Sequence, residues 1–145
     1  MEKNILIVED EAIIASGLKL CLNGLGYNVF KVVSNGEDAI ESLKKNNPDI
    51  ILMDIRLNGE KNGYETVNAI RKSSNTPVIY LIGGDPNQID EKAKYTKPYD
   101  YIIKPFDMDV LTEKIEKITE GHLNAVKFMP TDKNNKSLRR KNKES

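Results

Sequence analysis

Short, continuously apolar segments alternate along this chain with segments whose apolar residues recur at helical spacing. Residues 50–53 and 78–82 are the clearest apolar segments, and their length and β-branched content are typical of strands buried on both faces. The pattern predicts strands at 3–8, 27–33, 50–53, 78–82 and 99–103, and helical stripes within 14–25, 39–43, 64–70, 85–96 and 108–118.

The fourth of these helices has the weakest apolar face. Asp85 and Pro86 form a good N-cap and first-turn pair, and Gln88 is placed for a reciprocal capping contact. Only Ile89 and Ala93 offer a buried stripe. We therefore expect this helix to be short and loosely held.

Strict alternation of buried strands with amphipathic helices predicts an α/β fold, with a parallel sheet covered on both faces and joined by right-handed crossovers. In such folds the functional crevice lies beyond the carboxyl ends of the strands. Those ends carry Glu9, Asp10, Asp54 and Lys104 in this chain. Three acids and one lysine are therefore expected to converge on one rim.

The length of 145 residues fits one domain, and the formal net charge is zero. The charge is unevenly distributed, because residues 1–120 hold 20 acidic and 15 basic residues, whereas residues 121–145 hold 2 and 7. We expect a folded acidic domain over 1–120 and a basic, disordered tail or linker over 121–145. Nucleic-acid binding by the tail is the less favoured alternative, because no helix-turn-helix or interleaved aromatic residues accompany its basic residues.

No apolar run approaches the roughly 20 residues that a membrane helix needs. The first apolar run follows Met1 closely and is too short for the core of a signal peptide, so we expect a cytoplasmic protein without membrane contact. Cys21 is the only cysteine, which excludes a disulfide within the chain. Because Cys21 lies among leucines, we expect it to pack in the core.

The acids of the predicted rim suggest a metal site. Clustered carboxylates repel one another unless a cation lies between them, and carboxylate oxygens with open positions suit Mg²⁺. The alternative is that Glu9, Asp10 and Glu11 only cap the first helix and favour its positive end. Capping does not explain Asp54, which ends a buried strand.

Given a metal, Asp54 can act as a nucleophile toward a phosphoryl group and form an acyl phosphate. Lys104 would then neutralise charge on the transferring oxygens, although it could also be a surface lysine before the turn residue Pro105. A small phosphatase or kinase is a weaker interpretation. Arg56 stands two residues after Asp54, where such an enzyme would need a second acid.

Four collinear motifs resemble the receiver domain of two-component response regulators, over residues 3 to about 120. They are residues 8–11 (Val-Glu-Asp-Glu), 51–57 (Ile-Leu-Met-Asp-Ile-Arg-Leu), 77–81 (Pro-Val-Ile-Tyr-Leu) and 101–106 (Tyr-Ile-Ile-Lys-Pro-Phe). The resemblance implies a flavodoxin-like, doubly wound sheet of five parallel strands in the order 2-1-3-4-5, with five helices. It also implies phosphorylation by a histidine kinase with Mg²⁺, and signalling through the fourth helix, fifth strand and fifth helix.

The implied partners are the kinase and either a downstream protein or an attached output domain. The domain would act only on itself, accepting a phosphoryl group and losing it again, and would not be an enzyme for other substrates. Carried over residue by residue, the resemblance makes Asp54 the phosphoacceptor and a metal ligand, and Asp10 a direct Mg²⁺ ligand. Glu9 would act through water, the backbone carbonyl of Arg56 would be a further ligand, and Lys104 would pair with the phosphoryl oxygens.

The resemblance further places the aromatic switch at Tyr101, where simple packing is the alternative, and implies a cis bond between Lys104 and Pro105. One position departs from the family. Ile82 stands where the family has Thr or Ser, whose hydroxyl contacts the phosphoryl group, and Gly83 follows in the switch loop. A hydrogen bond to a charged group is worth roughly 1.5 to 3 kcal/mol, so its loss would weaken coupling to Tyr101.

Two hypotheses for the function remain open. The intact set of Glu9, Asp10, Asp54 and Lys104 motivates the first, whereas Ile82 and the weak apolar face of the fourth helix motivate the second. The first is a phosphoacceptor receiver that switches on phosphorylation of Asp54. The second is a receiver-shaped interaction module whose partner binding is largely independent of phosphorylation, because Ile82 cannot donate the switching hydrogen bond. A third possibility for Ile82 is that it simply extends a buried strand.

Overall fold

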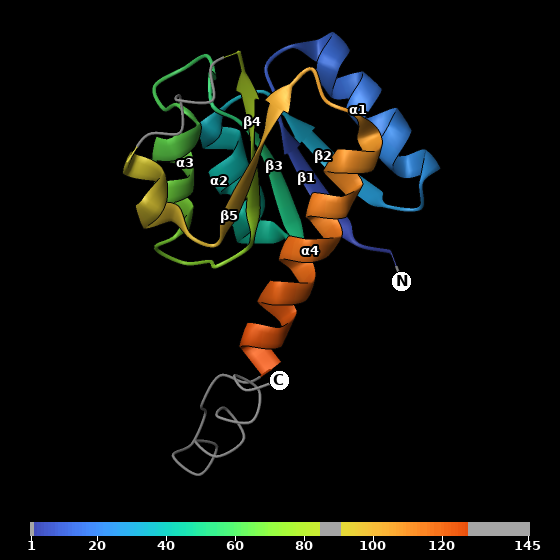
Figure 1. The fold of residues 1–145 in the computed structure, drawn as a ribbon. Coiled ribbons are helices and arrows are strands. Elements are labelled where there is room, and N and C mark those ends of the chain that lie inside the picture. The colour runs from blue at the N-terminus through green and yellow to red at the C-terminus, as the bar shows by residue number, and fades with distance from the viewer. Residues whose placement is uncertain (1, 85–90, 128–145) are drawn as a thin grey trace.

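The structure is a computed structural model that describes residues 2–84 and 91–127 (Figure 1). The described residues contain five strands, four α-helices and one 3-10 helix, η2. In chain order these are β1 (Asn4–Val8), α1 (Ala12–Gly24), β2 (Asn28–Val33), α2 (Gly36–Lys45), β3 (Ile50–Asp54), α3 (Gly63–Ile70), β4 (Val78–Gly83), η2 (Glu91–Thr96), β5 (Tyr99–Lys104) and α4 (Met108–Lys127).

All five strands are parallel and lie in the order β2-β1-β3-β4-β5. The predicted flavodoxin-like sheet is therefore confirmed. Helices α2, α3 and η2 cover one face of the sheet, and α1 and α4 cover the other (Figure 1). Each face is sealed by a separate apolar cluster, with Val67 of α3 buried in one and Leu111 of α4 buried in the other.

The three central strands explain the continuous apolar runs of the sequence. Strands β1, β3 and β4 have neighbours on both edges and helices on both faces, so nearly every residue in them is buried. The edge strands β2 and β5 show mixed burial instead. The burial of β3 extends through its last residue, so the carboxyl group of Asp54 is itself almost inaccessible to solvent.

Two helices begin at asparagine caps. The side chain of Asn35 accepts a hydrogen bond from the backbone N–H of Asp38 at 2.8 Å, at the start of α2. Asn62 and Glu65 form a capping box at the start of α3, in which each side chain accepts from the other residue's backbone N–H at 2.9 Å.

The predicted fourth helix lies partly outside the described residues, including Asp85, Pro86, Gln88 and Ile89. Its described part, η2, is a short 3-10 helix that ends at Thr96, before the predicted boundary at residue 97. Because residues 85–90 lie outside the described residues, the predicted short length of the whole element stays a prediction.

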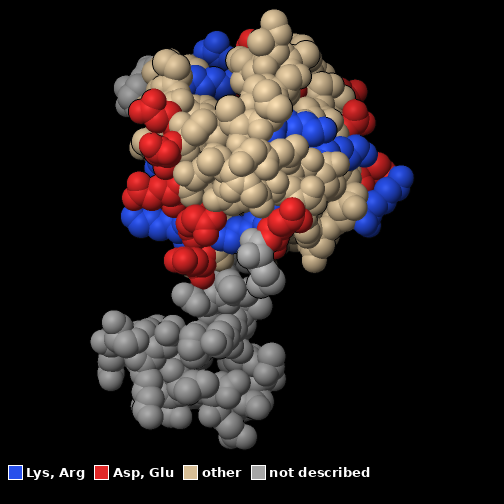
Figure 2. Space-filling model, turned by 90° about the vertical axis from the view of Figure 1, so that its right-hand side faces the viewer, with Lys and Arg blue, Asp and Glu red and all other residues tan. Residues whose placement is uncertain are grey.

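The prediction that Cys21 packs in the core is wrong. The buried residues of α1 are Ala15, Leu18 and Leu22, and Cys21 lies on the exposed side of the helix. One helical position is a rotation of 100°, which turns the side chain before Leu22 away from the sheet. The side of the molecule on which α1 lies shows a broad area without charged side chains (Figure 2), and Leu20 is among the exposed apolar residues of this helix.

Helix α4 continues to Lys127, past the predicted domain boundary at residue 120. The expectation of disorder is therefore wrong for residues 121–127, which are helical, and it stays a prediction for residues 128–145, which lie outside the described residues. Among the described residues, no helix combines the length and the apolar character needed to cross a membrane.

Gly63 allows α3 to begin directly against the end of β3. A Cβ atom at this position would lie 2.5 Å from the carbonyl oxygen of Asp54 and 2.9 Å from Cα of Ile55. The backbone N–H of Gly63 also donates to the carbonyl oxygen of Ile55 at 2.8 Å. Only glycine permits this approach, which supports the segment that carries Asp54.

Gly63→Ala should therefore destabilise the domain by about 1 to 3 kcal/mol, because backbone atoms must move to admit the methyl group. Gly17→Ala is the matched control in α1, where nothing lies within 4 Å of the added Cβ. That control should be neutral, or stabilising by up to about 1 kcal/mol. Urea unfolding of both variants measures the difference, and equal midpoints would contradict the steric argument.

Candidate functional site: an acidic cluster at the carboxyl ends of the strands

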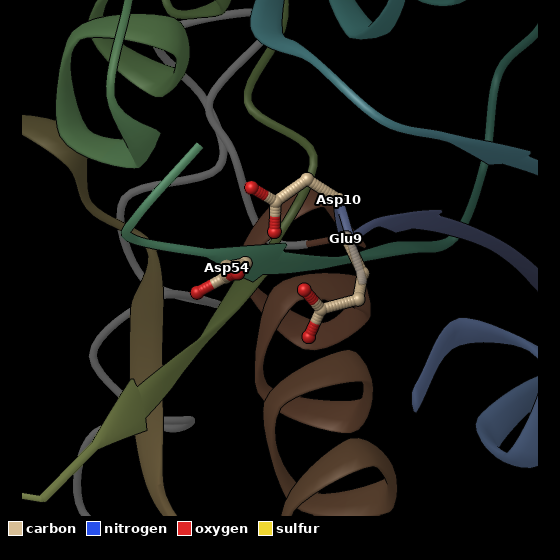
Figure 3. A group of neighbouring side chains, drawn as sticks. All are labelled: Glu9, Asp10 and Asp54. Atoms are coloured by element: carbon tan, nitrogen blue, oxygen red, sulfur yellow. The ribbon is translucent and has the colours of Figure 1, made fainter. Parts of the chain in front are cut away.

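Parallel pairing brings the predicted site residues to one edge of the sheet. Glu9 and Asp10 follow β1, Asp54 is the last residue of β3, and Lys104 is the last residue of β5. The side chains of Glu9, Asp10 and Asp54 gather around the end of β3 (Figure 3). The structure therefore assembles three acids and one lysine that lie up to 95 positions apart in the sequence.

The three acids form a compact group of oxygen donors. One carboxylate oxygen from each of Glu9, Asp10 and Asp54 lies within 4.8 Å of the others. Glu9 and Asp54 are only 1% and 5% exposed, whereas Asp10 is half-buried. Hard carboxylate oxygens around a partly open position fit Mg²⁺, which keeps several waters and takes few protein ligands.

Lys104 lies closer to Glu9 than to Asp54. Its Nζ atom donates to Oε1 of Glu9 at 2.8 Å and lies 3.8 Å from Oδ1 of Asp54. The lysine therefore balances part of the negative charge from one side of the cluster. One lysine cannot neutralise three carboxylates, so the cluster retains an excess of negative charge.

The pKa values reflect this excess. Burial raises the pKa of Asp54 to about 7, and the Glu9 carboxylate adds to the increase while Lys104 opposes it. Burial also raises the pKa of Glu9, but hydrogen bonds with Asp54 and Lys104 outweigh burial and leave that pKa below its ordinary value. Burial lowers the pKa of Lys104, yet its carboxylate neighbours more than compensate and the net pKa is raised.

With these pKa values, the buried carboxyl groups of Glu9 and Asp54 share one proton near neutral pH, and the proton stays on Asp54. A divalent cation would compete directly with that proton, since it stabilises both ionised carboxylates. The chemistry of the donor set therefore fits a metal better than it fits simple helix capping.

Backbone amides hold the two buried carboxylates in place. The N–H of Arg56 donates to Oδ1 of Asp54, and the N–H of Glu11 donates to Oε2 of Glu9, both at 3.2 Å. Each is a local contact two residues along the chain, so each orientation is set by the loop that follows the strand. The prediction that the carbonyl of Arg56 ligates a metal stays a prediction.

Ile82 is fully buried and paired with Ile103 of β5. It belongs to the apolar cluster on the face covered by α2, α3 and η2. Isoleucine, which stands where the family has Thr or Ser, therefore fills volume in the core. This agrees with the alternative that Ile82 simply extends a buried strand. Gly83 is exposed and stands in register with Lys104, and Gly84 has a φ of 88° that favours glycine.

Tyr101 lies on the edge strand β5 and is 39% exposed. The Nζ atom of Lys114 lies 5.8 Å from the centre of its ring. A tyrosine at this edge is not an interior packing residue, and its role as a switch stays a prediction. The bond between Lys104 and Pro105 is cis, as the resemblance implies.

Two features of the site were not found from the sequence. One is the steric need for Gly63, which the sequence showed only as a glycine near a loop. The other is the short contact between Lys104 and Glu9. These residues lie at the ends of β5 and β1, which are separated by β3 and β4, and no pattern in the sequence gives the distance between such side chains. The site residues themselves were identified from strand ends and motifs.

The fold and the site define this chain as an α/β domain with an acidic cluster at the carboxyl ends of its strands. Comparison with known proteins identifies its family. The family model for the response regulator receiver domain matches residues 5–116. The chain therefore belongs to the receiver domain family of response regulators.

Individual relatives support the assignment of this chain to the receiver domain family. The chemotaxis protein CheY of Thermotoga maritima is 31% identical over 121 residues, covering 83% of this chain and all of CheY. Several other curated relatives are longer regulators, and the chain spans only about half of their length, 46% to 55%.

Two solved structures are similar. The receiver domain of a diguanylate cyclase from Desulfovibrio desulfuricans has a TM-score of 0.77 and 34% identity, covering 83% of this chain and 96% of that chain. The receiver domain of a sensor histidine kinase from Pseudomonas aeruginosa, solved with a magnesium ion in its active-site cleft, has a TM-score of 0.68. It is 28% identical and covers 83% of this chain and 99% of that chain.

Replacing Asp54 tests the electrostatic cost of the cluster. Because folded Asp54 binds its proton more tightly than the unfolded chain, its contribution to stability is present at acid pH and is lost as the pH rises from about 4 to about 7. Asp54→Asn should therefore raise the free energy of unfolding at pH 8 without divalent metal, by on the order of 1 to 3 kcal/mol.

The gain should shrink toward zero at pH 4, and urea unfolding at both pH values measures it. Glu120→Gln removes the same charge from an exposed position of α4 and should change little. A wild type that is more stable than Asp54→Asn at pH 8 would contradict the account.

Proposed function

We propose that this chain is a phosphoacceptor receiver that is phosphorylated on Asp54 by a histidine kinase. The observation that supports it most strongly is the convergence of Asp10, Glu9 and Lys104 on the buried carboxyl group of Asp54. Membership in the receiver family supports this reaction for these residues. We expect the protein to act in the cytoplasm.

The transfer step requires an ionised Asp54. One of its oxygens bonds to phosphorus while the bond between phosphorus and the donor nitrogen breaks, and the electron pair leaves with the donor imidazole. The ammonium group of Lys104, now 3.8 Å from Asp54, would move its hydrogen bond from Glu9 to a phosphoryl oxygen. Hydrolysis of the acyl phosphate by water would restore the carboxylate.

Mg²⁺ would supply positive charge to the phosphoryl oxygens during transfer. Asp10 and Asp54 would hold it directly, Glu9 through water, and Arg56 through its backbone carbonyl. The backbone N–H of Arg56, which donates to Asp54, already orients the acceptor carboxylate. These roles follow the donor set of the structure and the resemblance of the motifs.

The signal would leave through the face formed by η2, β5 and α4, where Tyr101 is exposed. The downstream element would be another protein or an output domain joined to this one, since the chain spans only about half of several relatives. The residues that follow α4, 128–145, would serve as a basic tail or linker.

A second candidate is an interaction module whose partner binding depends little on phosphorylation. The burial of Ile82 in the core favours it, because no hydroxyl at this position can draw the following loop toward a phosphoryl group. In this candidate Asp54 could still be phosphorylated, with little effect on η2 and β5.

Phosphorylation itself is tested with Mg²⁺ and a small phosphodonor such as acetyl phosphate. The intact mass should increase by one phosphoryl group, and Asp54→Asn should abolish the increase. Asp38→Asn is the matched control on α2 and should be modified like the wild type. The absence of an adduct from both acetyl phosphate and a kinase would contradict the first candidate.

Coupling between the phosphoryl group on Asp54 and the elements η2 and β5 is tested separately. Beryllofluoride serves as a stable mimic of the phosphoryl group, and the amide resonances of residues 91–104 are recorded. If the missing hydroxyl limits switching, Ile82→Thr should enlarge the shifts of these amides several-fold relative to the wild type. The adjacent Leu81→Val keeps the site without a hydroxyl and serves as a control. Large shifts in the wild type, equal to those in Ile82→Thr, would exclude the second candidate.

A further inference from the structure

The 3-10 helix η2 is held to the sheet by a buried chain of hydrogen bonds. The hydroxyl of Tyr80 donates to Oγ1 of Thr96 at 2.7 Å, and that hydroxyl donates to the carbonyl oxygen of Ala93 at 2.6 Å. Tyr80 is 0% exposed and Thr96 is 1% exposed. Water is therefore excluded from both hydroxyl groups, and the Tyr80 hydroxyl relies on Thr96 as its acceptor while Thr96 relies on the carbonyl group of Ala93.

An aromatic stack fixes the position of the Tyr80 hydroxyl. The ring of Tyr80 lies between those of Tyr64 and Tyr99, with centroid distances of 4.9 and 5.7 Å. Tyr64 belongs to α3 and Tyr99 begins β5, so the stack joins three elements. A tyrosine so confined cannot turn its hydroxyl elsewhere without disturbing the core.

Arg71, which follows α3, completes the network. Its Nε atom donates to the carbonyl oxygen of Thr96 at 2.9 Å, and its Nη2 atom donates to that of Pro98 at 3.0 Å. A third nitrogen, Nη1, donates to the carbonyl oxygen of Ser74 at 3.2 Å. Burial lowers the pKa of this half-buried guanidinium to about 10, so it stays charged at neutral pH and its hydrogen bonds are charge-assisted.

Apolar burial contributes little to holding η2. Ala93 and Thr96 are its buried residues, whereas Tyr95 is 70% exposed. Burial of the methyl groups of Ala93 and Thr96 is a small term beside two buried hydrogen bonds and two partly buried ones from a cation. The polar network therefore determines whether η2 stays docked.

We propose that Arg71, Tyr80 and Thr96 form a latch that fixes η2 and the start of β5 against α3 and β4. Arg71 and Thr96 lie near the amino ends of β4 and β5, where the N–H of Val78 donates to the carbonyl oxygen of Pro98. Asp54 lies at the opposite, carboxyl end of the sheet. The latch therefore holds η2 and the start of β5 independently of Asp54. These two elements rearrange when the hydrogen bonds of the latch break. This inference goes beyond the proposed phosphoacceptor function and does not require it.

The test is amide hydrogen exchange of the full chain, unphosphorylated and without divalent metal. Tyr80→Phe keeps the ring and removes the hydroxyl, so exchange of the amides of residues 91–99 should accelerate by about 5- to 30-fold. Amides of β1 and α2 should stay within about twofold of wild type. Tyr99→Phe is the control, because it removes a hydroxyl from the same stack but outside the hydrogen-bond chain.

A second pair of variants separates the hydroxyl from the volume of the side chain. Thr96→Val should reproduce the local acceleration, and Thr96→Ser, which retains the hydroxyl, should stay close to wild type. Unchanged exchange in Tyr80→Phe and Thr96→Val, or an equal acceleration throughout the chain, would overturn the latch. Because no phosphodonor is present, a failure of phosphorylation on Asp54 would leave this result unaffected.

Discussion

Repulsion between buried carboxylates is the constraint on which the site depends. Glu9 and Asp54 lie close together and are both almost fully buried. Lys104 neutralises only part of their combined negative charge. Such an arrangement destabilises the metal-free fold at neutral pH, because the proton on Asp54 must be retained or a cation must replace it. The donor set of the site therefore fits a ligand that brings positive charge.

The fold imposes this proximity. Buried parallel strands end at a common edge, and the close approach of α3 at Gly63 supports the loop that follows Asp54. Hydrogen bonds from Tyr80 and Arg71 to Thr96 hold η2 near the amino ends of β4 and β5. The acidic cluster and η2 therefore rest on separate sets of contacts, and the buried side chain of Ile82 offers no polar group to either.

Most of the architecture could be predicted from the sequence because strand burial and helical spacing are local patterns, as in residues 50–53 and in α2. The site followed because strand ends in a parallel sheet are neighbours by topology. The exposure of Cys21 could not be predicted from leucine neighbours alone, since one step along a helix changes the face. The contacts of Arg71 with carbonyl groups 25 and 27 residues away also had no local signal.

We expect the cluster to hold a proton on Asp54 that a divalent cation displaces. The most direct measurement is the pH titration of the Asp54 carboxyl carbon by NMR, with and without Mg²⁺. We expect a midpoint near pH 7 in the metal-free protein, and saturating Mg²⁺ should move it to clearly lower pH. A metal-free midpoint near 4, or one that Mg²⁺ does not move, would contradict it.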